Sequence, residues 1–117
     1  MFDFITIGSA TIDAFVESEA ADIVSVSTKK TSTEFMAFPY GAKVEIDSFR
    51  TAVGGGGLNA AANLANLGFN TSAIFKIGED FQGKTIKHKV KLAHVDTSNI
   101  IESKTETSGF SDRKSVV

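Results

Sequence analysis

The sequence predicts an α/β fold with a parallel sheet core and a β-hairpin lid. Two observations carry this prediction. An apolar strand-like run opens the chain, and a helical period begins directly after the glycines at 54–57. The resulting order, a strand, a lid-like hairpin and then α, β, α, β, favours a core of parallel strands.

The first half of the chain reads as strands. The run FDFITIG at 2–8 is rich in strand formers, which predicts a buried strand ending at Gly8, and TIDAFVE at 11–17 predicts a second extended segment. The polar stretch at 18–33 contains the short apolar run IVSV, which indicates a surface strand or a loop.

The segment FMAFPYGAKVEIDSF at 35–49 alternates apolar and polar residues around Pro39, Tyr40 and Gly41. This pattern predicts a hairpin with one solvent-exposed face. Val44 and Ile46 would lie on one side, and the charged residues of the same stretch on the other.

The second half alternates helix and strand. Apolar residues at i, i+3, i+4 and i+7 predict a helix that Gly68 closes: Leu58, Ala61, Ala62 and Ala65. SAIFKIG at 72–78 predicts a strand, 82–93 a second helix with Ile86 and Val90 inward, and VDTSNII at 95–101 a further extended stretch.

Composition narrows the class of protein. The 117 residues, 42% of them hydrophobic, fit one modest core. A net charge of −2 is too small to indicate binding to nucleic acid or to a membrane surface. No cysteine is present, which excludes disulfides and thiolate metal sites, and no histidine spacing suggests a metal site. Without a basic leader or a long apolar run, the expected location is the cytoplasm.

One loop raises the question of a nucleotide. The stretch GEDFQGKT at 78–85 matches the phosphate-binding pattern G-x-x-x-x-G-K-[ST], in which backbone N–H groups wrap phosphate oxygens. However, Glu79 and Asp80 would bring two carboxylates close to a polyphosphate, and like charges repel. A P-loop nucleotide-binding protein using Gly78–Thr85 is therefore the weaker alternative.

The glycine-rich segment VGGGGLNAAANLANLG at 53–68 is the stronger candidate for a binding site. Glycines at a helix start let a ligand approach the backbone and its free N–H groups. Asn59 adds a donor and an acceptor that suit a hydroxyl group. The pattern indicates a polyol pocket, and the alternative is a tight turn that needs glycine for its own geometry.

These segments together resemble the ribokinase-like, or PfkB-type, carbohydrate kinases. The matching stretches are ITIGSATIDAF, AFPYGAKVEIDSF, VGGGGLNAAANLANLG and IFKIGEDFQGKTI with HVDTSNI. The resemblance implies a Rossmann-like ribokinase fold, of which this is the N-terminal portion. It also implies transfer of the γ-phosphoryl group of ATP, with Mg²⁺, to a hydroxyl of a sugar, nucleoside or related polyol.

The resemblance also implies particular site residues. Asp13 matches an acidic residue that binds substrate hydroxyls, and Thr11 stands where ribokinases often have asparagine. Gly54, Gly55 and Asn59 match the family's sugar contacts. GEDFQG resembles a loop of the family that is not its nucleotide site. His94 stands where many relatives have glycine, and histidine tolerates a left-handed cap.

The family's Gly-Ala-Gly-Asp segment, which supplies an anion hole and a catalytic base, does not occur in the sequence. We therefore expect an N-terminal fragment that is inactive alone and has neither catalytic residue nor ATP site. A non-catalytic sugar-binding or scaffold fragment is the alternative. By resemblance, 1–16 and 51–103 are core, 17–50 and 104–110 are a lid whose strands could pair in a homodimer, and 111–117 are a tail of uncertain origin.

Overall fold

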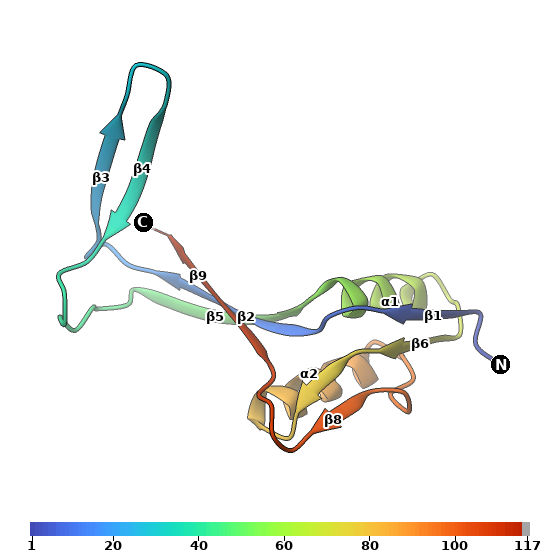
Figure 1. Ribbon diagram of the computed structural model, residues 1–117. Helices are drawn as coiled ribbons and strands as arrows, with labels where there is room; N and C mark the ends of the chain where they lie inside the picture. Colours follow the sequence, from blue (N-terminus) through green and yellow to red (C-terminus); the bar gives the residue numbers. More distant parts are fainter. Residues whose placement is uncertain (116–117) are drawn as a thin grey trace. The chain divides into compact units, whose positions relative to one another are not determined.

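The computed structural model describes residues 1–115 and divides the chain into two compact units. The first comprises Met1–Asp13 and Thr51–Ser111, and the second comprises Ala14–Arg50 with residues 112–115 (Figure 1). The elements are β1 (Phe4–Ile7), β2 (Thr11–Glu17), β3 (Asp22–Ser27), β4 (Ser32–Ala37), β5 (Ser48–Gly54), α1 (Gly56–Asn66), β6 (Thr71–Ile74), β7 (Lys76–Gly78), α2 (Phe81–Leu92), β8 (Ile101–Ser103) and β9 (Gly109–Ser115). Residues 116 and 117 of the predicted tail lie outside the described residues.

Two pairs of strands in the first unit are parallel, as predicted. β1 pairs with β6, Phe4 opposite Thr71, and β7 pairs with β8, Lys76 opposite Ile101. The single strand expected from SAIFKIG is divided at Phe75, whose carbonyl accepts a hydrogen bond from the Ile101 N–H at 2.9 Å. The chain changes its strand partner at this point, so one apolar run serves two pairings.

Helix α1 begins and ends at glycines. Gly55, at the N-cap, has φ +101°, and Gly68, just past the C-cap, has φ +95°. The Gly68 N–H donates to Ala65 O at 2.9 Å and the Phe69 N–H to Leu64 O at 3.2 Å, which is the Schellman pattern. The predicted cap is therefore confirmed, and α1 packs on β1 and β6 (Figure 1).

Helix α2 has side-chain and backbone caps. The Asp80 side chain caps its N-terminus by accepting from the Gly83 N–H. At the other end His94 has φ +59°, and the Val95 N–H reaches Val90 O at 3.2 Å. His94 thus occupies the left-handed position that the sequence suggested. Ile86 and Val90 are buried, as expected.

The main cluster of buried hydrophobic residues lies in the first unit. Its buried members are Ala10, Ile12, Leu58, Ala61, Ala73, Phe75, Ile77, Ile86, Val90 and Val95. The prediction that 2–8 forms a buried strand is wrong on burial, because Phe4, Ile5 and Ile7 of β1 are exposed. Within the described residues β1 pairs with one strand, β6, and packs against helix α1.

The second unit contains an antiparallel hairpin formed by β3 and β4 (Figure 1). The surface strand anticipated at IVSV is β3, and the turn lies at Thr28 and Thr31, where the Thr28 N–H donates to Thr31 O at 2.7 Å. The predicted hairpin around Pro39–Gly41 is wrong. Residues 43–47 form no strand.

Contacts with the end of β2 explain the irregular course of 43–47. The Ser18 hydroxyl donates to Glu45 O at 2.6 Å, and the Asp47 N–H donates to Glu17 O at 2.9 Å. Val44 and Ile46 line an apolar pocket of about 260 Å³ inside this unit. The apolar residues of the alternating pattern do share one side of the segment, but that side faces this pocket and not a hairpin partner.

A three-stranded sheet has the strand order β5-β2-β9. No helix of the described part of the chain is long and apolar enough to cross a membrane.

Candidate functional site

Three of the five predicted site residues meet in the first unit. Thr11 and Asp13 lie two apart on β2, so both side chains point to the same face of the strand. The Thr11 hydroxyl is 3.5 Å from Asp13 Oδ1, at the long limit of a hydrogen bond. A Cβ atom added at Gly54 would lie 3.0 Å from Asp13 Oδ2 and 3.6 Å from Thr11 Oγ1. Glycine at 54 therefore leaves the space beside this half-buried carboxylate.

Gly55 is glycine for its own geometry. Its φ of +101° disfavours other residues, and an added Cβ would lie 2.5 Å from Ser9 O. The same Ser9 carbonyl accepts the N–H groups of Gly57 and Leu58, each at 3.1 Å. This part of the glycine run matches the tight-turn interpretation, because it lets α1 start against the end of β1.

Asn59 lies in the first turn of α1, where its N–H donates to Gly55 O at 2.9 Å. Its side chain is exposed. The backbone of the helix start therefore connects Asn59 to Gly54 and Gly55, while the meeting of its amide with Asp13 stays a prediction.

Ser9 is a residue that the sequence interpretation missed. Its hydroxyl accepts the Gly56 N–H at 3.2 Å, and its carbonyl accepts two further amides of the helix start. No local pattern signals this contact, because Ser9 lies 47 residues from Gly56 in the sequence, while the N-cap preference concerns the residue directly before a helix.

The arrangement suits the recognition of hydroxyl groups. The Asp13 carboxylate accepts only, the Thr11 hydroxyl both donates and accepts, and both sit beside a bare glycine backbone. A polyol with adjacent hydroxyls matches this donor and acceptor set. Hydrogen bonds to a charged partner are worth about 1.5–3 kcal/mol each.

The loop that resembles a phosphate site is already occupied by protein groups. The Gly78 N–H donates to Ser108 Oγ at 2.9 Å, the Glu79 N–H to Ser103 O at 2.8 Å, and the Gly83 N–H to Asp80 Oδ1 at 2.7 Å. A phosphate cradle needs such amides free. The residues present at Gly78–Thr85 therefore do not fit a nucleotide.

The Asp80 carboxylate accepts hydrogen bonds from Ser108 and Gly83. The Ser108 N–H donates to Oδ2 at 2.8 Å, and the Ser108 hydroxyl and the Gly83 N–H both donate to Oδ1 at 2.7 Å. The Ser108 N–H, followed by the Gly83 N–H and the Ser108 hydroxyl, lowers the pKa of Asp80 below its ordinary value, and its own backbone N–H adds to this. Ser108 was not identified from the sequence, since nothing in it signals a partner 28 residues from Asp80.

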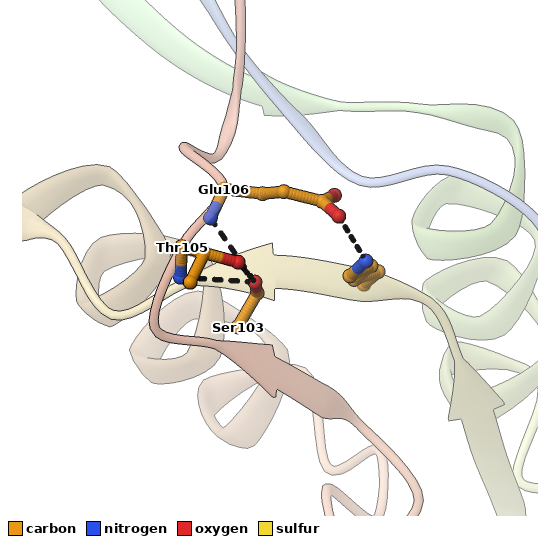
Figure 2. A network of polar contacts seen from close by, with 4 residues as sticks. Ser103, Thr105 and Glu106 are labelled. Carbon is orange, nitrogen blue, oxygen red and sulfur yellow. Dashed lines mark hydrogen bonds and ion pairs between the residues drawn. The ribbon is translucent and has the colours of Figure 1, made fainter.

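The turn that leads to Ser108 is built in the same way. Ser103 Oγ accepts the N–H groups of Thr105 at 3.3 Å and Glu106 at 3.1 Å (Figure 2). The Glu106 carboxylate also pairs with Lys76 at 2.7 Å. Within the described residues, no group of three or more His, Cys, Asp or Glu side chains could hold a metal ion.

Comparison with known proteins identifies the family. A family model described as pfkB family carbohydrate kinase matches residues 16–111. The chain therefore belongs to the pfkB family of carbohydrate kinases. It is 36% identical over 72 residues to a 2-dehydro-3-deoxygluconokinase of Bacillus subtilis (strain 168), a match that covers 62% of this chain and 22% of that protein.

Solved structures show the same fold. The Arabidopsis thaliana ribokinase complexed with ribose and ATP matches 91% of this chain with 25% identity and a TM-score of 0.71. A carbohydrate kinase from Agrobacterium tumefaciens matches 99% with 23% identity and a TM-score of 0.73. The ribokinase-like α/β fold is thus confirmed. The chain spans 30% and 32% of the length of these two proteins.

Proposed function

We propose that this chain carries the acceptor-substrate part of an ATP-dependent carbohydrate or nucleoside kinase. In this proposal Asp13 and Thr11 bind hydroxyl groups of the acceptor, and Gly54, Gly55 and Asn59 line the same pocket. The single observation that carries it is the contact of Thr11, Asp13 and Gly54, which places a carboxylate and a hydroxyl beside a glycine backbone.

The acceptor class is a sugar or related polyol, a nucleoside included. The similarity to a 2-dehydro-3-deoxygluconokinase and the likeness to a ribokinase solved with ribose supply two substrates to test. 2-Dehydro-3-deoxygluconate is an acid and ribose is neutral, so the two compounds test different acceptor chemistries. Both belong to the proposed acceptor class.

In the whole kinase, ATP and Mg²⁺ supply the phosphoryl group and its charge compensation. This chain, in our proposal, contains neither the base nor the nucleotide site, because the Gly-Ala-Gly-Asp segment is absent from its sequence. Phosphoryl transfer depends on positioning and charge stabilisation, so the chain alone should bind an acceptor without phosphorylating it. A non-catalytic sugar-binding or scaffold role has the same binding chemistry.

Three further parts of the proposal concern organisation. Residues 1–16 and 51–103 would act as the core of the kinase, and 17–50 and 104–110 as its lid. The lid strands would pair two copies in a homodimer, supported by the exposed apolar side chains of β3 and β4. The protein would work in the cytoplasm, where ATP and phosphorylated sugars are found.

The experiment titrates ribose, 2-dehydro-3-deoxygluconate and adenosine into the 117-residue chain by calorimetry, with ATP turnover measured in parallel. Wild type should bind at least one of them and turn over none. Asp13→Asn should weaken that binding at least tenfold, about 1.4 kcal/mol. Asp22→Asn, at the exposed start of β3 in the other unit, is the matched control and should bind as wild type does.

Three results would count against the proposal. If none of the three compounds binds, the chain has no working acceptor pocket. If one binds and Asp13→Asn binds it equally, the pocket lies elsewhere. ATP-dependent phosphorylation by the chain would show that the missing segment is not needed for activity.

A further inference from the structure

We propose that Asp80 and Ser108 are positioning residues of the acceptor pocket, which act by holding the start of β9 against Thr11. The inference rests on the proposed function, because it concerns the same pocket. Neither residue is proposed to touch the ligand. Their contribution would be to fix a neighbour of the residues that do.

Ser108 is held through both its backbone and its side chain. Its N–H and its hydroxyl donate to the two oxygens of Asp80 at 2.8 and 2.7 Å, and its Oγ accepts the Gly78 N–H at 2.9 Å. Ser108 is buried, at 7% exposure. Three hydrogen bonds on one small buried residue leave its Cα little freedom, and the residue that follows shares this constraint.

That following residue, Gly109, lies against the candidate pocket. A Cβ atom added there would lie 2.9 Å from Thr11 Cγ2 and 3.4 Å from Ala10 O. Gly109 also starts β9, the neighbour of β2 in the sheet order β5-β2-β9. The backbone at 109 is therefore in close contact with the side of β2 that carries Thr11, and Thr11 Oγ1 faces Asp13 Oδ1.

The hydrogen-bond network of Asp80, Ser108, Gly78 and Gly83 does more than cap helix α2. A cap needs one side-chain oxygen for the N–H groups of the first turn, and Asp80 Oδ1 serves the Gly83 N–H at 2.7 Å. The second oxygen, Oδ2, accepts the Ser108 N–H, and Ser108 belongs to the segment that follows β8 in the chain. This second function connects the start of α2 to the strand beside the pocket, and all of these residues belong to the first compact unit.

The test uses the ¹⁵N-labelled 117-residue chain with two measurements: amide chemical shifts, and affinity for ribose and 2-dehydro-3-deoxygluconate. Asp80→Asn and Ser108→Ala should shift the amides of Thr11 and Asp13. Each should also weaken binding of whichever compound binds by about fivefold or more, because Gly109 is no longer held against Thr11 and the pocket loses its fixed geometry.

Asp96→Asn is the matched control. Asp96 also accepts from the N–H and the hydroxyl of one serine, Ser98, in the same unit, but that pair is not joined to β9. It should leave the Thr11 amide and the affinity unchanged. Gly109→Ala approaches the same contact from the other side: its new methyl group would press on Thr11 and weaken binding, while the Gly83 amide keeps its protection from hydrogen exchange.

Ser108→Thr separates positioning from simple loss of stability. Threonine keeps the hydroxyl that donates to Asp80, so it should restore most of the affinity that Ser108→Ala loses. If Asp80→Asn does not fold, the Ser108→Ala and Ser108→Thr pair carries the same comparison. Equal affinities in these two variants, or no shift at Thr11 in any network variant, would overturn the inference.

The outcomes for the two proposals are distinct. If wild type binds no polyol, the acceptor function fails, while the shifts at Thr11 and Asp13 still decide whether the network positions β2. If wild type binds and Asp13→Asn abolishes binding, but Asp80→Asn and Ser108→Ala match wild type in both measurements, the function stands and the positioning role is wrong.

Discussion

The backbone N–H of Gly83 donates to the carboxylate of Asp80 at 2.7 Å, inside the loop at 78–85 whose sequence matches a phosphate-binding pattern. The glycine that would wrap a phosphate therefore already has an anion of the protein as its partner. An added Cβ at Gly83 would lie 2.1 Å from Gly78 O, so the glycine serves close packing of the loop.

The first prediction follows from this contact. Titrating Mg-ATP into the labelled chain should leave the amides of residues 78–85 unshifted, and Lys84→Ala should behave like wild type. In a genuine cradle the lysine contacts phosphate, and its loss would weaken nucleotide binding about tenfold or more. Saturable shifts in this loop that Lys84→Ala removes would re-establish the nucleotide interpretation.

The second prediction concerns pH. The pKa of Asp80 is lowered, chiefly by the Ser108 N–H, because the donors around it stabilise the ionised form. Its contribution to stability is therefore complete above the pKa of an unfolded aspartate, about 3.9, and is lost as the pH falls through the lower folded value.

Urea unfolding of wild type and Asp80→Asn between pH 7 and pH 2 measures this contribution. The difference in unfolding free energy should be constant down to about pH 5 and shrink below about pH 4. Ser108→Ala removes a donor, so it should raise the midpoint of the Asp80 carboxyl titration seen by NMR. A difference that does not change with pH would show that the carboxylate charge adds nothing to folding.

Local patterns in the sequence predicted the helices well. The period of Leu58, Ala61 and Ala65 and the closing Gly68 define α1, because helix periodicity and a left-handed cap are encoded within a few residues. The alternation around Val44 and Ile46 led to the wrong prediction of a hairpin. Alternation indicates which side of a segment is apolar, but it does not indicate which segment packs against that side. The real partner of β4 is β3, which precedes it.

The candidate site was predictable only in part. Asp13 and Gly54 came from the resemblance to the family, and the structure brings them together. The bond between Asp80 and Ser108 joins residues 28 apart, and no short pattern records such a pairing. Long-range polar contacts of this kind depend on how the chain returns after β8, which a single sequence does not specify.

The third prediction compares two neighbouring glycines. Gly55→Ala should destabilise the chain by about 2 kcal/mol or more, because the residue has φ +101° and its Cβ would lie 2.5 Å from Ser9 O. Gly56→Ala, one residue on, meets nothing within 4 Å and starts a helix, so it should stabilise by about 0.4–1 kcal/mol. Urea melts compare them, and equal effects would contradict the left-handed geometry of this turn at Gly55.

The fourth prediction tests pairing through the hairpin. Val24, Val26 and Phe35 lie on one face of the β3–β4 hairpin and are 46%, 52% and 53% exposed. An apolar face of this kind favours self-association. Val26→Glu should weaken association measured by sedimentation at least tenfold, about 1.4 kcal/mol. Ser25→Glu, on the opposite face, is the control, and equal association of both variants would remove the hairpin as the interface.

The most direct test of the acceptor pocket is to map a bound polyol onto the chain by NMR, using whichever of ribose, 2-dehydro-3-deoxygluconate and adenosine binds. Saturation should shift the amides of Gly54 and Gly55 and the side-chain amide of Asn59 together, with one dissociation constant, and Asp13→Asn should abolish these shifts. Shifts confined to residues outside this set, or an Asn59 side chain that does not respond while the ligand saturates, would contradict a shared acceptor pocket.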